Sequence, residues 1–208
     1  GPFFSEEEAA SFNKSRGWTM VPDSGRGYRR VVASPEPKAT LEADAISTLI
    51  DSGNIVVAAG GGGIPVMLKD GVYKGVDAVI DKDFAAERIA DAANADALVM
   101  VTGVSTVMLD FGKETQRAVE NLTVAEAEKH LGDGQFPPGS MGPKMSAAIE
   151  FVSGKPAEGR SRFAAITTPE LVYATLDEIA GSVIEGGRGT LIVPNAVASY
   201  SSSKEAAE

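Results

Sequence analysis

The sequence predicts an α/β fold in which helices cover both faces of a mainly parallel sheet. Three observations favour this fold class: all-apolar runs at 55–59 and 97–101, amphipathic stretches of about ten residues between such runs, and Gly or Pro at the junctions. All-apolar runs are typical of strands that are buried on both faces. Strands that alternate with helices are typical of a parallel sheet.

The beginning of the chain differs from the rest, because a short helix is followed by a hairpin-like excursion with little core of its own. Ser5 precedes three Glu residues in a segment that ends in bases, a distribution typical of a capped helix. Residues 17–37 place aromatic residues among Gly, Pro and Asp-Ser-Gly turns, which indicates a hairpin. This segment also holds a basic cluster that either forms a solvated patch or binds an anionic ligand: Arg26, Arg29 and Arg30.

Residues 39–193 form the predicted α/β domain, and its elements follow from local signals. Gly53 ends the first helix, a capping box of Thr123 and Glu126 opens a middle one, and Pro169 stands where a helix begins. The expected helices are 41–52, 83–95, a segment from 123 to near 130, 141–153 and 168–180. The expected strands are 55–59, 97–102, 163–167 and 189–193, with a hairpin at 66–76 and an extended segment at 104–109. Residues 194–208 are predicted to be a disordered tail.

Composition argues against several classes of function. With 19 Lys+Arg, 29 Asp+Glu and a net charge of −10, the chain is poorly suited to nucleic acid or an anionic membrane surface. The absence of Cys excludes disulfides, Cys-ligated zinc and thiol nucleophiles, and the single histidine, His130, makes hydrolase triads a poor fit. The apolar runs are far shorter than the roughly 20 residues of a membrane helix. These features predict a soluble, cytoplasmic protein.

Glycines after a predicted buried strand are the first candidate ligand site. Ligands of parallel sheets bind beyond the carboxyl ends of the strands, and four glycines directly follow the strand expected at 55–59: Gly60, Gly61, Gly62 and Gly63. Glycine permits positive φ and lets backbone N–H groups approach an anion. The same run could also be a flexible turn, and it matches neither the Walker A nor the dinucleotide-binding pattern.

Two lysines at predicted helix starts are the next candidates. Lys82 lies between Asp81 and Asp83, whose carboxylates either organise metal and phosphate or simply cap the helix. Lys144 lies in the first turn of the helix that begins at Met141, where the helix dipole disfavours a cation unless an anion binds beside it. The two lysines are therefore candidates for a phosphate site, with helix capping and an exposed lysine as the open alternative.

Four segments of the chain match the motifs of a known family. They are Asp-Ser-Gly-Arg-Gly-Tyr-Arg-Arg from Asp23, Ala-Gly-Gly-Gly-Gly-Ile-Pro-Val from Ala59, Val-Ile-Asp-Lys-Asp-Phe-Ala from Val79 and Gly-Gln-Phe-Pro-Pro-Gly-Ser-Met-Gly-Pro-Lys from Gly134. In this order they resemble the carbamate kinases of the amino acid kinase family, and the combination is specific. The resemblance implies reversible phosphoryl transfer between ATP and carbamate, giving ADP and carbamoyl phosphate, with Mg²⁺.

The resemblance also implies site roles. Lys82 is similar to a lysine that contacts phosphate, Asp83 to the aspartate that orients the active-site lysines, and Lys144 to the lysine that meets the nucleotide phosphates and the transferring group. The glycine run is similar to the loop that faces the transfer centre. Residues 1–38 resemble a protruding lid whose three arginines would close over the anionic substrate. The nucleotide side of the cleft is implied at Thr102, Gly103, Val104 and Met141.

The family pattern includes a further N-terminal portion that these 208 residues do not match. The resemblance therefore implies an incomplete fold, catalytic only with a complementary N-terminal segment, and a homodimer when complete. Without that segment, an open sheet edge and an uncovered apolar face would favour association. Two alternatives stay open: a non-catalytic ATP- or ADP-binding fragment, and another amino acid kinase that acts on a carboxylate or a nucleotide monophosphate.

Overall fold

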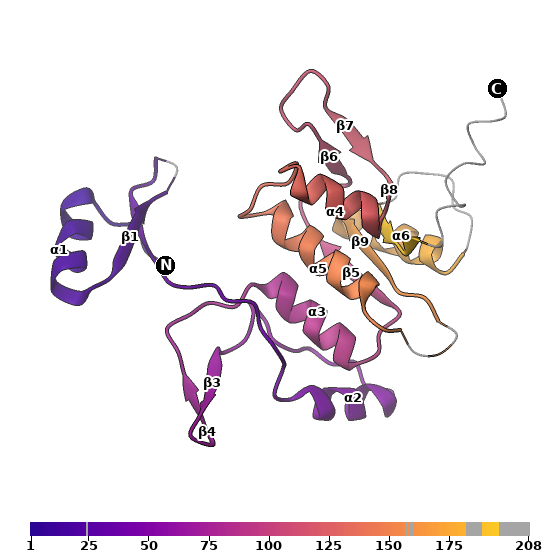
Figure 1. Ribbon diagram of the computed structural model, residues 1–208, viewed down its shortest axis with the longest axis horizontal. Coiled ribbons are helices and arrows are strands. Elements are labelled where there is room, and N and C mark those ends of the chain that lie inside the picture. The colour runs from indigo at the N-terminus through magenta and orange to yellow at the C-terminus, as the bar shows by residue number, and fades with distance from the viewer. Residues whose placement is uncertain (24, 157, 159, 182–188, 196–208) are drawn as a thin grey trace. The chain divides into compact units, whose positions relative to one another are not determined.

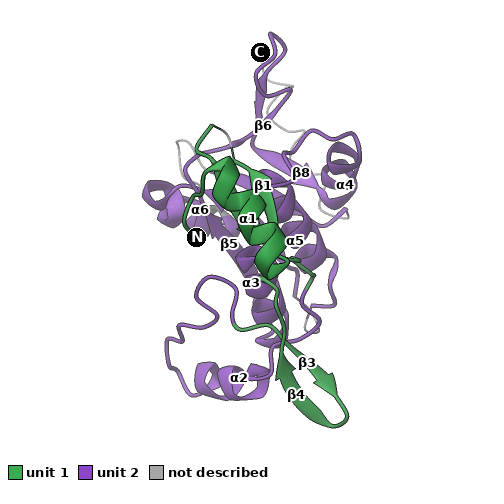
Figure 2. Ribbon diagram, turned by 90° about the vertical axis from the view of Figure 1, so that its left-hand side faces the viewer, with its two compact units in different colours: residues 1–36, 64–80 green, residues 37–63, 81–208 purple. Residues whose placement is uncertain are grey.

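The structure is a computed structural model that describes the chain except for residues 24, 157, 159, 182–188 and 196–208 (Figure 1). Most of the tail predicted to be disordered, 194–208, therefore lies outside the described residues. The chain divides into two compact units: unit 1 is Gly1–Glu36 with Ile64–Ile80, and unit 2 is Pro37–Gly63 with Asp81 onward (Figure 2).

Unit 1 begins with a helix and a hairpin that the sequence predicts. Helix α1 (Glu6–Arg16) starts at a capping box, in which Ser5 accepts a hydrogen bond from the Glu8 N–H and the Glu8 side chain accepts one from the Ser5 N–H. Strands β1 (Thr19–Pro22) and β2 (Tyr28–Val31) pair antiparallel. Among the described residues of unit 1, Ala9 of α1 is the one buried apolar residue, and the Phe12 ring contacts the rings of Phe4 and Trp18.

A second hairpin also belongs to unit 1, which differs from the predicted division at residue 38. It consists of β3 (Val66–Lys69) and β4 (Val72–Gly75). A parallel bridge between Ala33 and Ala78 ties the hairpin to the first segment, and the Val79 N–H donates to the Ala33 carbonyl at 2.9 Å. Because these contacts are far apart in sequence, local patterns do not reveal them.

The sheet of unit 2 has four strands in the order β5 (Ala97–Val101), β9 (Phe163–Thr167), β10 (Thr190–Val193) and β8 (Asn121–Thr123). The β5–β9 and β10–β8 pairs are parallel, whereas β9 and β10 are antiparallel. The predicted α/β class with a mainly parallel sheet is therefore confirmed, although β8 was not expected from the sequence.

Helices lie on both faces of this sheet, as predicted. Helices α3 (Lys82–Ala92), α4 (Val124–Gly132) and α5 (Met141–Ser153) lie on one face, and α6 (Val172–Ile179) packs against the other (Figure 1, Figure 2). Helix α5 forms the centre of the core, since Met145, Ala148 and Phe151 have no exposed surface. No helix in the described part of the chain has the length and apolar character needed to cross a membrane. The described part of unit 2 also contains α2 (Ala43–Asp51) and the 3₁₀ turn η1 (Pro169–Leu171).

Two short strands, β6 (Val107–Leu109) and β7 (Arg117–Val119), form an arm beside the main sheet. The buried Thr190 hydroxyl joins the arm to β10. It accepts a hydrogen bond from the Val107 N–H at 2.8 Å and donates one to the Val119 carbonyl. One side chain thus satisfies a backbone group of each strand in the arm.

The predicted buried strand at residues 55–59 is wrong in this structure. The segment belongs to no strand, and Ile55 and Val57 are 98% and 95% exposed. Val56 and Ala58 are half-buried, so the side chains alternate as in a strand with one covered face. A strand needs a neighbour for its backbone groups, and the described residues provide none for this segment.

Candidate functional site

The candidate site lies at the start of α3. Asp81 caps this helix, because its side chain accepts a hydrogen bond from the Asp83 N–H at 2.8 Å. The cap places Asp83 in the first turn, where it is only 6% exposed. The capping interpretation of this motif is therefore observed for Asp81, while Asp83 is available for a different contact.

The start of α5 supplies that contact. Lys144 is 7% exposed, and its Nζ lies 2.9 Å from Oδ1 and 2.8 Å from Oδ2 of Asp83. Lys82, whose side chain is 60% exposed, places its Nζ at 3.5 Å from Oδ2 of the same carboxylate. The structure thus brings Lys144 to the adjacent residues Lys82 and Asp83, although 61 positions separate Lys144 from Asp83. One lysine of the cluster is buried and the other reaches solvent.

The electrostatics of this cluster favour an anion. Two ammonium groups, those of Lys82 and Lys144, surround the Asp83 carboxylate, while the Asp81 carboxylate is engaged in capping α3. The first turns of α3 and α5 both contribute residues, and helix N-termini attract anions through their N–H groups. Ser140, the cap residue of α5, forms no side-chain cap hydrogen bond. The arrangement can therefore hold and neutralise a phosphate group.

A close backbone approach fixes the start of α5. The Gly142 N–H donates to the Pro137 carbonyl at 2.9 Å. A Cβ at Gly142 would lie 3.0 Å from that carbonyl oxygen, tighter than ordinary van der Waals contact. Glycine at this position lets the Pro-Pro-Gly-Ser segment fold against the helix and orient Lys144 two residues later.

The glycine run forms a turn that requires its residues. Gly60, Gly62 and Gly63 have φ values of 53°, 135° and 84°, and the 135° of Gly62 lies well outside the usual left-handed region of other residues. The Gly62 N–H donates to the Ala59 carbonyl at 3.0 Å. Gly61 completes the turn, and all but Gly62 are exposed. The run keeps its predicted phosphate-facing role as a proposal, because no contact observed here tests it.

The predicted nucleotide-side residues lie at two places in unit 2. Thr102 directly follows β5, and its N–H donates to the carbonyl of Thr167, the last residue of β9, at 2.8 Å. Gly103 and Val104 come next and are exposed at this carboxyl edge, where ligands of such sheets bind. Met141 is the half-buried first residue of α5 and packs against the core.

The three arginines predicted to form part of a lid are already engaged with carboxylates of unit 1. Arg26 and Arg29 bind Asp23 at 2.9 and 2.8 Å, and Arg30 binds Asp77 at 3.2 Å. The hydrogen bond from Arg26, followed by that from Arg29, holds the pKa of Asp23 below its usual value. Their expected contact with an anionic substrate therefore stays a prediction.

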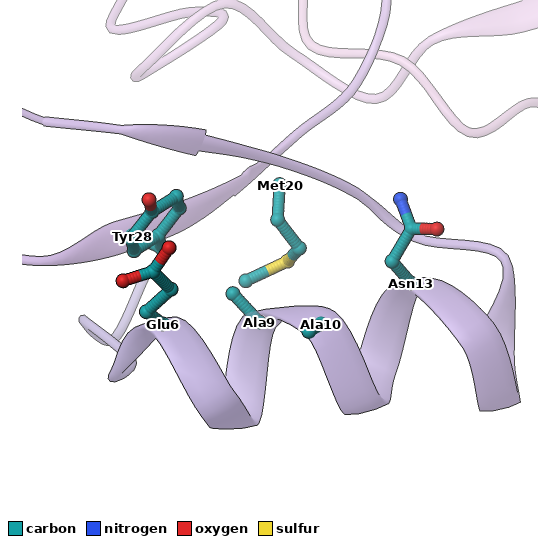
Figure 3. Close-up of a pocket in the computed structure, with 6 residues that line it drawn as sticks. All are labelled: Glu6, Ala9, Ala10, Asn13, Met20 and Tyr28. Atoms are coloured by element: carbon teal, nitrogen blue, oxygen red, sulfur yellow. The ribbon is translucent and has the colours of Figure 1, made fainter.

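Unit 1 also contains a shallow hollow of about 380 Å³ between α1 and the β1–β2 hairpin (Figure 3). Apolar and polar side chains line it in similar proportion, and none of the predicted site residues is among them. The lining residues are Glu6, Ala9, Ala10, Asn13, Met20 and Tyr28.

Sequence reasoning missed one buried acid near the site. Glu87 lies one helical turn after Asp83 on α3 and is 2% exposed. Burial raises its pKa to about 7, and Arg88 opposes this by attraction. The spacing of four residues from Asp83 is a signal that it shares a helix face with it. Among the described residues, no three carboxylates or imidazoles gather into a cluster that could hold a metal ion.

Comparisons with known proteins give consistent matches. The family model described as the amino acid kinase family matches residues 12–158. Carbamate kinase 3 of Staphylococcus aureus is 44% identical over 192 residues, covering 92% of this chain and 58% of that protein. The carbamate kinase of Trichomonas vaginalis is 46% identical over 199 residues, covering 94% of this chain and 59% of that protein.

Solved structures agree with these matches. Carbamate kinase from Giardia lamblia bound to AMP-PNP has a TM-score of 0.77 and 36% identity, covering 94% of this chain and 58% of that chain. The 208 residues therefore span about 58% of the length of the relatives that they match.

Proposed function

The chain belongs to the amino acid kinase family, and on this premise we propose that it is the nucleotide-phosphate part of a carbamate kinase. The reaction is reversible phosphoryl transfer between ATP and carbamate, giving ADP and carbamoyl phosphate. The observation that carries the proposal is the cluster of Lys82, Asp83 and Lys144 at two helix N-termini. The AMP-PNP bound to the Giardia relative supports ATP or ADP as the nucleotide.

The cluster suits the chemistry of this transfer. A carbamate oxygen bonds to the γ-phosphorus while the bond from that phosphorus to the β–γ bridging oxygen breaks. Carbamate is already anionic, so no proton has to be removed before attack. The loose transition state mainly needs alignment and positive charge around the moving group.

Each residue of the cluster then has a distinct role. Asp83 binds the Lys144 ammonium through both carboxylate oxygens, which provides a partner for this buried group and fixes its direction. Lys144 holds the transferring group, and the exposed Lys82 reaches the outer phosphate oxygens. Mg²⁺, when bound, would neutralise charge on the nucleotide phosphates, since phosphate oxygens commonly supply its ligands together with water.

We further propose that activity requires a complementary N-terminal segment, and that the completed enzyme is a cytoplasmic homodimer. Exposed apolar residues support the need for completion. In unit 2, Ile55 and Val57 lie almost fully in solvent. In unit 1, taken by itself, Leu68 and Tyr73 are partners across the β3–β4 hairpin and are also exposed. Neighbouring exposed apolar side chains commonly mark a site where another chain binds.

The test measures ATP formation from ADP and carbamoyl phosphate. The 208-residue chain is assayed alone and after co-expression with the N-terminal segment of a relative such as the Staphylococcus aureus enzyme. We expect turnover only in the second case, and at least about a hundredfold lower turnover for Lys144→Ala, the scale of removing one transition-state donor. Lys129→Ala is the matched control, because that side chain is 74% exposed on α4.

The outcomes separate the proposal from its alternatives. A completed protein that binds ADP but forms no ATP would instead be a non-catalytic nucleotide-binding fragment. Transfer to acetylglutamate or a nucleotide monophosphate, with carbamate as a poor competitor, would identify another branch of the amino acid kinase family. Equal turnover of Lys144→Ala and Lys129→Ala would remove Lys144 from the mechanism.

A further inference from the structure

Glu87 lies in the contact between the two helices that carry the candidate site. Helices α3 and α5 pack against each other, and the Asp83–Lys144 pair bridges them at their N-terminal ends. Glu87 follows Asp83 by one turn on α3 and is almost completely buried. The reaction proposed above makes no use of this acid.

The Glu87 carboxylate is poorly satisfied in its surroundings. Arg88 Nη1 lies 3.0 Å from Oε2, but this oxygen has no hydrogen bond in the described part of the chain. The distance is short enough for an ion pair, whereas the direction is unsuitable for a hydrogen bond. Arg88 also donates to the Pro37 carbonyl at 2.9 Å and to Glu150 Oε2 at 3.0 Å. Its guanidinium is therefore shared among several acceptors.

A buried arginine in the same region, Arg162, has a hydrogen-bond donor without a partner among the described residues. Arg162 precedes β9, is buried, and donates from Nη1 to Asp91 Oδ1 at 2.6 Å. Its guanidinium carbon lies 5.0 Å from the ring centre of Phe151 in α5. Gly154 leaves room for it, since a Cβ there would lie 2.6 Å from Nη1. The Arg162 Nε has no hydrogen-bond partner among the described residues.

The charges around Glu87 balance only while Glu87 is neutral. Arg88 and Arg162 supply two positive charges, and Asp91 on α3 and Glu150 on α5 supply two negative ones. Ionised Glu87 makes the group negative by one. Helix α2 also contacts α3 and carries only acids, Asp44 and Asp51, and β5 carries no charge.

We propose that Glu87 is a positioning residue that packs as a neutral acid and, on losing its proton, loosens the α3–α5 contact that aligns Asp83 with Lys144. Burial and the neighbouring acids raise its pKa to about 7, so the change falls near neutrality. An uncompensated charge in such a contact is relieved by admitting water or by turning Arg162. Either movement would shift α3 against α5. We expect this shift to change the geometry of the Asp83–Lys144 salt bridge, which lies one helical turn away.

The test follows the Lys144 side chain directly in the 208-residue chain labelled with ¹³C at lysine Cε. The Lys144 signal is the one that Lys144→Arg removes, and it is recorded by NMR from about pH 5.5 to about 8.5. We expect a shift with a midpoint near pH 7 in the native chain. Glu87→Gln should abolish that shift, because the amide stays neutral. No turnover is measured, so failure of the proposed reaction leaves this test unaffected.

Two further variants separate Glu87 from other groups. Glu150→Gln removes a carboxylate that opposes ionisation of Glu87, and should move the midpoint to lower pH. His130→Gln should leave the midpoint unchanged; it is included because α4 packs on α5 and histidine ordinarily titrates near neutrality. The proposal is overturned if the Lys144 signal does not shift with pH, or if it shifts in the same way in Glu87→Gln. It is also overturned if His130→Gln abolishes the shift.

Discussion

The buried Glu87 makes the stability of unit 2 depend on pH in a way that can be calculated. Its pKa is about 7 in the folded chain, whereas the ordinary pKa of a glutamate side chain, taken for the unfolded chain, is 4.5. A carboxyl group with a raised pKa stabilises the fold while protonated, and this stabilisation is lost as the pH rises from about 4.5 through about 7. The difference of about 2.5 between the two pKa values corresponds to about 3 kcal/mol. Glu87→Gln, which stays neutral, should therefore match the native chain near pH 4 and exceed it by about 3 kcal/mol near pH 8.

The measurement is urea unfolding of both chains at several pH values, followed by the helical circular dichroism signal. Trp18 fluorescence is less suitable, because Trp18 belongs to unit 1 and Glu87 to unit 2. Other titrating groups such as Asp23 contribute equally to both chains and cancel in the difference. Glu128→Gln on the exposed surface of α4 is the control and should differ from the native chain by less than about 0.5 kcal/mol at every pH. A Glu87→Gln difference that does not vary with pH would refute the reasoning.

Three more substitutions test other parts of the structure. Thr190→Val keeps the side-chain volume but leaves the buried Val119 carbonyl and a β6 N–H without their partner, so urea unfolding should show a loss of about 2 to 4 kcal/mol. Ser5→Ala removes the cap of α1 and should cost about 1 kcal/mol, measured by thermal unfolding with Trp18 fluorescence. Asp83→Asn strands the buried Lys144 charge; we expect a loss of about 3 to 5 kcal/mol in unfolding and a fall in turnover of the completed enzyme. Unchanged unfolding in any of the three would contradict the contact concerned.

The sequence predicted the elements whose signals are local. Helix α5 and strand β9 have the predicted bounds, 141–153 and 163–167. The Pro-Pro-Gly-Ser segment before α5 and the apolar run of β9 are both features of neighbouring residues in the sequence. Strand β8 was missed, since only three residues form it and its pairing with β10 joins positions about 70 apart. The assignment of residues 64–80 to unit 1 was missed for the same reason.

The candidate site was predictable in part. Lys144 was identifiable because a lysine in a first helical turn opposes the helix dipole, and the resemblance implied that Asp83 orients the active-site lysines. The structure adds that Lys144 is buried and that its Nζ contacts both carboxylate oxygens of Asp83. Glu87 gave a weaker signal, because glutamate is common on exposed helix faces. Its surroundings include Arg162, which is buried, lies 75 positions away and attracts the Glu87 carboxylate. Spacing along one helix cannot reveal a partner supplied by another element.

The error at residues 55–59 has a physical explanation that bears on the proposed completion. An apolar run bounded by Asn54 and glycines is typical of a central strand, and Val56 and Ala58 are covered on one side as that pattern requires. Exposing Ile55 and Val57 gives up about 1.5 to 3 kcal/mol of burial for each side chain. A segment with strand composition, strand alternation and no neighbour fits a sheet that a further strand extends. The sequence pattern and the structure therefore disagree at residues 55–59, where we propose that the N-terminal segment binds. When the chain is combined with that segment, the backbone amides of residues 55–59 should be the first to gain protection from hydrogen exchange.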